Sequence, residues 1–336
     1  MYDKNSIIEK INKIRKDIDH DKVDINIKEI FLKNKDLWII GEDRVDKSAI
    51  IGKGGWVVGR LKEDLSLDNI HVESYEEFIL KKYKLELSLK YLNKFINETK
   101  LNKEPFLNLK TLIENKINNI YSFNYKEFFK NNDFNTSQKA IVALSGGVDS
   151  SFSLIIAKAL GFDVIAISID PGSIILPNHF KRNIENLTEK LNVPHKYVKS
   201  DYTTIIEESL SGKKHPCGNC SKQIEEEINK VARSMDIPLV IYGDMISTGN
   251  QSIKVDGNIT RLNLPAILLT SKYEIKELVS DYGIEKIEGF GCPLLYEVHK
   301  KYPHMKKFSI GRILRETRAS ALESGEALDL IWSFYK

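Results

Sequence analysis

The sequence predicts an α/β protein in which a parallel-sheet domain follows a smaller α+β domain. From Lys139 onward, short apolar runs alternate with segments of helical apolar spacing, a pattern typical of a parallel sheet covered by helices on both faces. The first 75 residues lack this alternation and place two strands next to each other. With 336 residues, the chain is long enough for two such domains and a connecting segment.

The N-terminal elements can be assigned in chain order. Helical spacing over residues 4–18 predicts an amphipathic helix and involves Ile7, Ile8, Ile11, Ile14 and Ile18. Strands are predicted at 23–31, 36–43 and 69–74, and two short helices, "DKSAII" and "WVVGRLKEDL", lie between the last two strands. A longer helix is predicted at 76–98. We therefore expect a small domain at 1–75 and a helical connector at 76–137.

A glycine-rich tetrapeptide, Gly52-Lys53-Gly54-Gly55, separates the two short helices. This loop and the surrounding element order resemble a type II KH domain, in which a G-x-x-G loop clamps the backbone of a short single strand of nucleic acid. The resemblance implies that Gly52, Lys53, Gly54 and Gly55 bind RNA, with Lys53 meeting a phosphate and Arg60 and Lys62 nearby. The alternative is a helix–helix turn without a ligand.

The elements of the second domain, expected at 138–300, follow a regular order. Strands are predicted at "AIVAL" and at 163–170, 195–199 and 238–243, followed by the apolar run "LNLPAILL". Helices are predicted at 150–160, 179–191, 203–210, 221–235 and 272–282. Because ligands of parallel sheets gather at the carboxyl ends of the strands, the site is expected there.

The first strand of this domain ends in Ser145-Gly146-Gly147-Val148-Asp149-Ser150-Ser151. A glycine loop between a strand and a helix directs backbone N–H groups toward an anion, and the hydroxyls add donors. Asp149 would repel a phosphate unless it contacts a magnesium ion or caps backbone donors. The G-x-x-x-x-G-K-[ST] pattern of Walker-type nucleotide hydrolases is missing from this loop.

The motif closely resembles the PP-loop of the ATP pyrophosphatase family, whose Rossmann-like fold is that of the adenine nucleotide alpha hydrolases. Members split ATP into AMP and pyrophosphate and use the AMP to activate a carbonyl oxygen. The resemblance covers about residues 138–300 and implies that residues 145–151 hold the phosphates of ATP with Mg²⁺. It also implies that Asp170 and Gly243, at two further strand ends, face the nucleotide, and that Asp149 is catalytic.

The three cysteines, Cys217, Cys220 and Cys292, select among PP-loop chemistries. Cys-x-x-Cys followed by a distant Cys-Pro resembles the three-cysteine 2-thiouridine and 2-thiocytidine tRNA synthetases. In that group the thiolates hold a [4Fe–4S] cluster, leaving one iron open for the sulfur that acts as nucleophile. The resemblance implies that all three cysteines are ligands of the metal centre and that Cys217 and Cys220 are also catalytic.

Other chemistry could explain the same cysteines. A Zn²⁺ site would need a fourth ligand, for which His215 and His299 are candidates. A redox or persulfide pair would need no metal. Buried cysteines without a shared role are the remaining alternative.

One segment departs from the thiolation enzymes, which carry a Gly-His-Asn-x-Asp-Asp-like sequence after the fourth strand. Here the place reads Gly243-Asp244-Met245-Ile246-Ser247-Thr248, so the paired carboxylates are absent. Asp244 is the one acid left for an acid or base role. A divergent branch is indicated.

The C-terminal segment, 301–336, is predicted to be helical and basic. Arg312, Arg315 and Arg318 recur every three residues and would form one stripe, either contacting RNA phosphates or pairing with Glu316 and Glu323 in solvent. The net charge of +3 means that any affinity for nucleic acid must come from such local patches.

These features together predict an ATP-dependent RNA sulfurtransferase that acts on tRNA and receives sulfur from free sulfide or a carrier. A PP-loop sulfurtransferase or amidotransferase for a small molecule, and an RNA-binding protein that senses nucleotide, are the alternatives. No apolar run of about 18 residues predicts a membrane span, and the charged start lacks a signal-peptide core. We expect a cytoplasmic protein, and a homodimer is left open.

Overall fold

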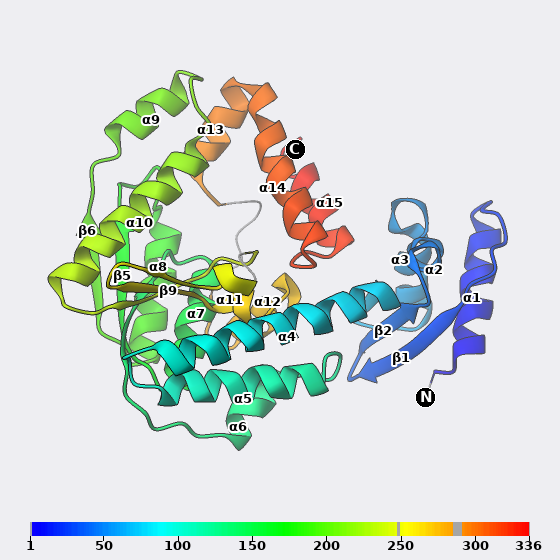
Figure 1. The fold of residues 1–336 in the computed structure, drawn as a ribbon. Coiled ribbons are helices and arrows are strands. Elements are labelled where there is room, and N and C mark those ends of the chain that lie inside the picture. Colours follow the sequence, from blue (N-terminus) through cyan, green and yellow to red (C-terminus); the bar gives the residue numbers. More distant parts are fainter. Residues whose placement is uncertain (1, 247–248, 285–290, 336) are drawn as a thin grey trace. The chain divides into compact units, whose positions relative to one another are not determined.

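The computed structural model describes residues 2–246, 249–284 and 291–335 (Figure 1). Contacts divide the chain into two units, residues 1–84 with 115–124 and residues 85–114 with 125–336. The helices α4 (Tyr75–Glu98) and α5 (Glu104–Asn118) each contribute to both units. The region expected as a connector, 76–137, is therefore divided between the two units by its packing.

The first unit is a three-stranded sheet packed against helices. Its elements are α1 (Lys4–Asp17), β1 (Ile27–Lys33), β2 (Asp36–Gly41), α2 (Arg44–Ile51), the 3-10 turn Lys53–Gly55, α3 (Trp56–Asp64) and β3 (Asn69–Ser74). The central strand β2 pairs antiparallel with β1 and parallel with β3. Leu37 and Ile39 of β2 join the isoleucines of α1 in the core, whereas Trp38, between them, stacks on His71 with ring centroids 4.5 Å apart. The element order agrees with the one that the sequence predicts for this region.

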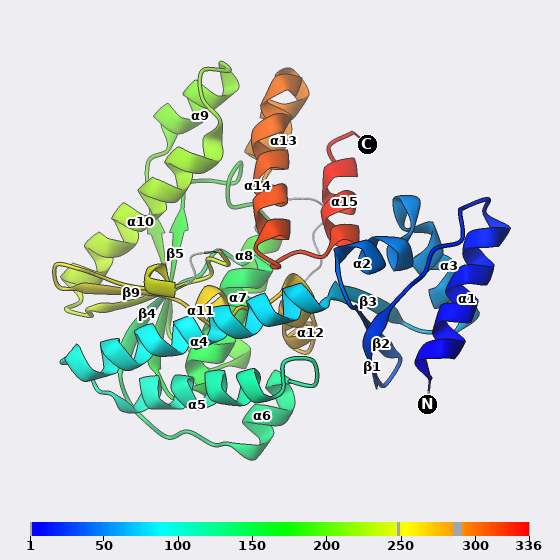
Figure 2. The same ribbon diagram turned by 45° about the vertical axis from the view of Figure 1, so that its right-hand side comes forward.

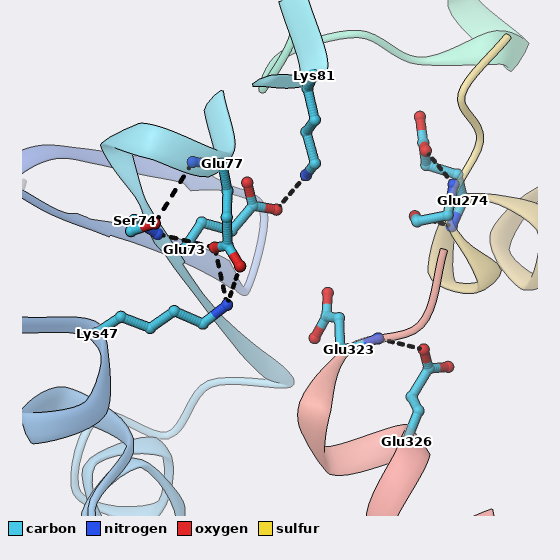
Figure 3. A network of polar contacts seen from close by, with 9 residues as sticks. Lys47, Glu73, Ser74, Glu77, Lys81, Glu274, Glu323 and Glu326 are labelled. Atoms are coloured by element: carbon cyan, nitrogen blue, oxygen red, sulfur yellow. Dashed lines mark hydrogen bonds and ion pairs between the residues drawn. The ribbon is translucent and has the colours of Figure 1, made fainter. Parts of the chain in front are cut away.

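Polar contacts fix the start of α4 at the end of β3 (Figure 3). The Ser74 N–H donates to the Glu77 carboxylate at 2.9 Å, and the Glu77 N–H donates to the Ser74 hydroxyl at 3.4 Å. This reciprocal pair is a capping box, which satisfies backbone donors that a helix start leaves free. Glu77 also accepts from Lys47 at 2.7 Å, and Glu73 pairs with Lys81. Glu323 and Glu326 form another capping box at the start of α15 (Figure 3).

The second unit contains a six-stranded sheet in the order β6-β5-β4-β7-β9-β8. These strands are β4 (Lys139–Ala143), β5 (Asp163–Asp170), β6 (His195–Lys199), β7 (Leu239–Tyr242), β8 (Ile253–Asp256) and β9 (Ile259–Asn263). All neighbours pair parallel except β8 and β9. The chain runs outward from β4 through β5 to β6 and then crosses to β7 on the other side of β4. The strand order thus reverses between β4 and β7, the position where α/β sheets bind ligands.

Helices cover this sheet and extend beyond it (Figures 1 and 2). They are α6 (Tyr125–Asn131), α7 (Val148–Ala159), α8 (Asn178–Lys190), α9 (Thr203–Leu210), α10 (Pro216–Ser234), α11 (Leu264–Ile267), α12 (Lys272–Ser280), α13 (Pro293–Lys301), α14 (Lys306–Arg318) and α15 (Ser324–Trp332). The 3-10 turns are Gly249–Gln251 and Pro303–Met305. Across the described ranges, each helix is too short or too polar to cross a membrane.

The α/β prediction is confirmed, and the differences from it are local. The helix expected at 221–235 begins at Pro216, so the cysteine pair lies inside its first turns. The run "LNLPAILL" forms the end of β9 and the short helix α11, because β9 pairs with β7 and with a hairpin partner, β8.

The second unit has a buried apolar core on its sheet. Ile141 of β4 and Ile167 of β5 pack with Ile228 and Ala232 of α10 in one buried cluster. The helix α7 buries every residue from Ser150 to Ala157, because it is enclosed within the unit. An enclosed strand and helix hold the loop between them firmly in place.

Candidate functional site

The loop between β4 and α7 depends on glycine. Gly146 has φ +76°, and a Cβ there would lie 2.4 Å from the Phe180 carbonyl oxygen of α8. The Asn183 side chain donates to the Gly146 carbonyl at 3.1 Å and fixes the loop against α8. Gly147 precedes α7 without a side-chain cap, so the first N–H groups of the helix are not taken by a capping side chain. Such N–H groups favour an anion.

The three hydroxyls of the loop have different surroundings. The Ser150 hydroxyl accepts from the Ser145 N–H at 3.1 Å and donates to the Gly147 carbonyl at 3.0 Å, which holds the loop closed. Ser151 is fully buried, and its hydroxyl has no partner among the described residues. Ser145 is the exposed hydroxyl. Of the three hydroxyls expected at the phosphates, Ser145 is therefore placed to reach a ligand, and Ser150 shapes the loop.

Asp149, in the first turn of α7, pairs with Lys272, the first residue of α12. Their side chains are 26% and 15% exposed, so both are partly shielded from solvent. A lysine thus neutralises the carboxylate that would otherwise repel phosphate. Lys272 was not among the residues singled out from the sequence. The signal available in the sequence was the pair Ser271-Lys272, which follows an apolar run and begins a predicted helix.

Gly243 follows β7 and lies against the start of α7. A Cβ at this position would lie 2.8 Å from the Ser150 nitrogen and 2.9 Å from the Asp149 carbonyl carbon. Only glycine therefore allows β7 to approach the loop so closely. This packing explains the residue type at 243, and contact with a nucleotide stays a prediction.

Asp170 lies at the carboxyl end of β5, the parallel neighbour of β4. Its carboxylate accepts from Lys181 at 2.7 Å and from the Gly172 N–H at 3.0 Å. Burial by itself would raise the pKa of Asp170, but the hydrogen bonds from Lys181 and Gly172 outweigh it, and the pKa is lowered. Asp170 is thus a charged group at the carboxyl ends of the strands, the same edge of the sheet from which the phosphate loop leaves β4.

Asp244 is bound in a separate charge cluster. Its carboxylate pairs with Arg261 of β9, which also pairs with Glu225 of α10 at 2.7 Å and lies 4.2 Å above the Tyr242 ring. These contacts give Asp244 a cationic partner, and its role as an acid or base stays a prediction. Ser247 and Thr248, from the same departing segment, lie outside the described residues.

The three cysteines come from two helix starts. Cys217 and Cys220 are three residues apart in α10 and share a face, and Cys292 directly precedes α13. All three are half-buried free thiols. Burial raises the pKa of each, and the charge of Cys292 raises it further for Cys217 and for Cys220, whose pKa reaches about 12. The fold thus brings Cys292 close enough to the pair for their charges to interact.

The three thiols suit a metal bound through thiolates, and the choice between an iron–sulfur cluster and a zinc ion stays a prediction. Within the described ranges, no group of three or more His, Cys, Asp or Glu side chains is arranged to hold a metal ion. In a cluster each thiolate binds a different iron, so the sulfurs need not converge on one ion. The ring nitrogens Nε2 of His215 and His299 already contact the Ser309 hydroxyl, at 3.3 and 3.2 Å.

Arg312 connects the cysteines with the phosphate loop electrostatically. Its Nε donates to the Glu316 carboxylate at 2.8 Å, and its side chain is 47% exposed. Burial would lower the pKa of Arg312, but the charges of Glu316, Cys217 and Asp149 outweigh it and raise the pKa. The same guanidinium charge works against burial at Cys217. Arg315 and Arg318 are exposed as well, and all three arginines stay predicted RNA contacts.

The glycine tetrapeptide of the first unit forms an exposed turn between α2 and α3. Gly52, Gly54 and Gly55 have φ values of +73°, +64° and +78°. A Cβ at Gly52 would lie 2.2 Å from Val57 Cγ2, and one at Gly54 would lie in ordinary contact, 3.5 Å, with the Trp56 ring. At Gly55 a Cβ would meet nothing within 4 Å. Lys53 is exposed, and Trp56, which follows the turn, is 64% exposed. The turn is thus accessible to a backbone of another molecule, and RNA binding there stays a prediction.

Comparisons with known proteins identify relatives of this chain. The family model described as "Queuosine biosynthesis protein QueC" matches residues 139–234. The uncharacterized protein MJ1638 of Methanocaldococcus jannaschii is 36% identical over 247 residues, 74% of this chain and 90% of that protein. A tRNA-specific 2-thiouridylase MnmA of Bradyrhizobium is 24% identical over 57% of this chain and 56% of its own length.

Among solved structures, a similar one is the "U34-tRNA thiolase NcsA from Methanococcus maripaludis with its [4Fe-4S] cluster". The match covers 60% of this chain and 72% of the NcsA chain, with 14% sequence identity and a TM-score of 0.36. This chain spans little more than half the length of the Bradyrhizobium thiouridylase.

Proposed function

Because the chain belongs to the PP-loop ATP pyrophosphatase superfamily, in one family with the MJ1638 protein, we propose that it is an ATP-dependent tRNA sulfurtransferase. In this reaction a nucleobase carbonyl oxygen attacks the α-phosphate of ATP, and pyrophosphate leaves. A sulfur nucleophile then attacks the activated carbon, and AMP departs with the former carbonyl oxygen. The sulfur comes from free sulfide or a sulfur carrier.

The observation that carries this proposal is the convergence of two chemistries in one unit. Asp149 belongs to the loop that suits phosphates, and Cys217 and Cys220 belong to the cysteine group. Cys220 packs against the buried cluster that contains Ile141 of β4, the strand that ends in the phosphate loop. An ATP site that only hydrolysed or sensed nucleotide would have no use for three grouped thiols. Sulfur transfer to an adenylated carbon requires both sites close together.

The residues of the chain have separate tasks in this scheme. The N–H groups at the start of α7, with Ser145 and Lys272, would hold the phosphates. Mg²⁺ commonly binds through one or two carboxylates together with phosphate oxygens, and Asp149 would be its protein ligand. Asp170 would meet the nucleoside at the end of β5. Bound by Cys217, Cys220 and Cys292, a [4Fe–4S] cluster would supply an iron site for sulfur.

The first unit supports an RNA substrate. Its element order and exposed Gly52–Gly55 turn are those expected of a KH-like module that binds the RNA backbone. The relatives named as tRNA thiouridylases agree with tRNA as the partner. A homodimer stays a prediction, which light scattering of the purified protein would test.

The test is a reconstituted reaction without oxygen. Purified protein, ATP, Mg²⁺, sulfide and unmodified tRNA should yield AMP and a nucleoside whose mass reports exchange of oxygen for sulfur. Asp149→Asn should abolish AMP formation, whereas Lys222→Gln, at an exposed site on α10, should leave it unchanged. Native tRNA mass after prolonged reaction, with the cluster present, would contradict the proposal.

A second candidate is a PP-loop enzyme that modifies a small molecule. The match of residues 139–234 to the QueC family model favours it, since that family is described by queuosine biosynthesis. The two candidates separate by product. AMP formation that needs a small carbonyl compound and is indifferent to tRNA would support the second candidate.

A further inference from the structure

A cavity of about 540 Å³, open to solvent, lies in the second unit between the loop before α10 and the start of α14. Its volume lies within the range of small-ligand sites, about 300–1,000 Å³. Six of its ten lining residues are exposed, so a chain could enter and leave it. The proposed ATP site does not use this cavity.

The lining is cationic. Lys213, Lys214 and Lys307 border the cavity and give it positive charge, and no Asp or Glu is among its lining residues. His215 and His304 also line it; burial and the charge of Arg312 lower the pKa of His215, which favours its neutral form. Lys214 pairs with Glu208 at 3.0 Å. Lys213 and Lys307 make no ion pair with any residue that the structure describes, so their charge can act on a ligand. A site of this charge selects an anion.

An aromatic ring gives the cavity a second property. Phe308 lines it and is 50% exposed, which leaves an apolar face toward solvent. The Lys307 ammonium lies 5.1 Å from the Phe308 ring centroid, and the His215 ring lies 5.5 Å away. Exposed aromatic rings among cations are the features with which proteins bind single-stranded nucleic acid, one base stacking on each ring.

The cavity also borders the cysteine pair. Gly218 and Asn219, which lie between Cys217 and Cys220 in the first turns of α10, form part of its lining. A ligand held here would be next to the proposed sulfur-transfer centre.

From the cavity, its charge and its ring, we propose that this site binds a nucleotide of single-stranded RNA beside the nucleotide to be modified. Lys213 and Lys307 contact the phosphates, and a base stacks on Phe308. The inference rests on the proposed function, because it assigns the RNA substrate a position at the cysteine centre. An RNA strand is favoured over a free nucleotide because the cavity is open and lies away from the PP-loop residues.

The experiment measures RNA binding to the full chain by fluorescence anisotropy. The probes are a fluorescein-labelled oligouridylate and labelled tRNA, each titrated at several salt concentrations. Phe308→Ala should weaken oligouridylate binding at least about fivefold, the lower end for loss of one stacked base. Lys213→Gln with Lys307→Gln should reduce the slope of log affinity against log salt by about 0.7 per lost phosphate contact. Lys222→Gln is the matched surface control.

The outcomes separate the site from the function. Wild-type affinity and salt slope in both cavity variants, with native melting temperatures, would overturn the cavity assignment and leave the sulfurtransferase proposal intact. Displacement of the RNA probe by AMP, lost in the variants, would identify a free-nucleotide site and also overturn it. RNA binding that depends on the cavity in a protein that never thiolates tRNA would support the site and refute the function.

Discussion

Replacing Lys272 by methionine should impair ATP binding and destabilise the second unit. The change keeps most of the side-chain volume and removes the cation that pairs with Asp149. The carboxylate would then lie uncompensated in the loop that receives the phosphates. Both a lost attraction and a new repulsion would act on ATP.

The magnitude follows from the exposure of the pair. Exposed ion pairs contribute about 0–1 kcal/mol, and breaking a buried pair costs about 3–5 kcal/mol. At 15% and 26% exposure, Lys272 and Asp149 lie between these limits. We expect a coupling free energy of about 1–2 kcal/mol between the two side chains.

The assay is a double-mutant cycle on the free energy of unfolding. Wild type, Lys272→Met, Asp149→Asn and the double variant are unfolded in urea, and ATP affinity is measured by calorimetry. Asp149→Asn should partly restore the stability of Lys272→Met, because the unpaired carboxylate is removed. ATP affinity should fall in Lys272→Met at least about tenfold, the effect of about 1.4 kcal/mol.

Additive free energies in this cycle would refute the reasoning, since two side chains in contact must couple. Unchanged ATP affinity in Lys272→Met, with a normal fold, would show that the lysine serves stability alone.

Four further predictions concern other parts of the chain. Protein purified without oxygen should be brown with about four irons per chain, and Cys217→Ala should lose the colour but keep ATP affinity; a colourless wild type would contradict the cluster. Lys53→Glu should weaken tRNA binding in a gel-shift assay without changing the melting temperature; equal affinity would reduce the exposed turn to a scaffold. Gly243→Ala should destabilise the unit in urea by about 1–3 kcal/mol through its 2.8 Å contact, while Gly311→Ala, whose Cβ meets nothing within 4 Å, should be neutral or stabilising. Asp170→Asn should lower the free energy of unfolding at neutral pH, because the contacts that lower the pKa of Asp170 stabilise its charged form. The difference in unfolding free energy between wild type and variant should vanish as the pH falls through the folded pKa, below 3.8. Its persistence in acid would be inconsistent with the pairing.

The sequence by itself determined the features that depend on local spacing. Apolar periodicity predicted most helices and strands of both units, although not β8 or α11. The Ser145–Ser151 motif located the phosphate loop between a strand and a helix. The grouping of three cysteines followed from a resemblance, not from periodicity. Apolar spacing and local motifs describe residues that are close together in the sequence, within one helix, strand or loop. They do not show which distant residues come into contact.

Only the tertiary structure decided which distant residues meet. Lys272 pairs with Asp149 across 123 positions of sequence, and Arg312 lies in electrostatic range of both Asp149 and Cys217. Likewise, Arg261 engages Asp244, so that the one acid left in the departing segment has a structural partner. These pairings depend on the path of the chain through the sheet order, which no local spacing encodes. Residues with the same side chains thus acquire different roles because folding, and not sequence distance, sets the charges around them.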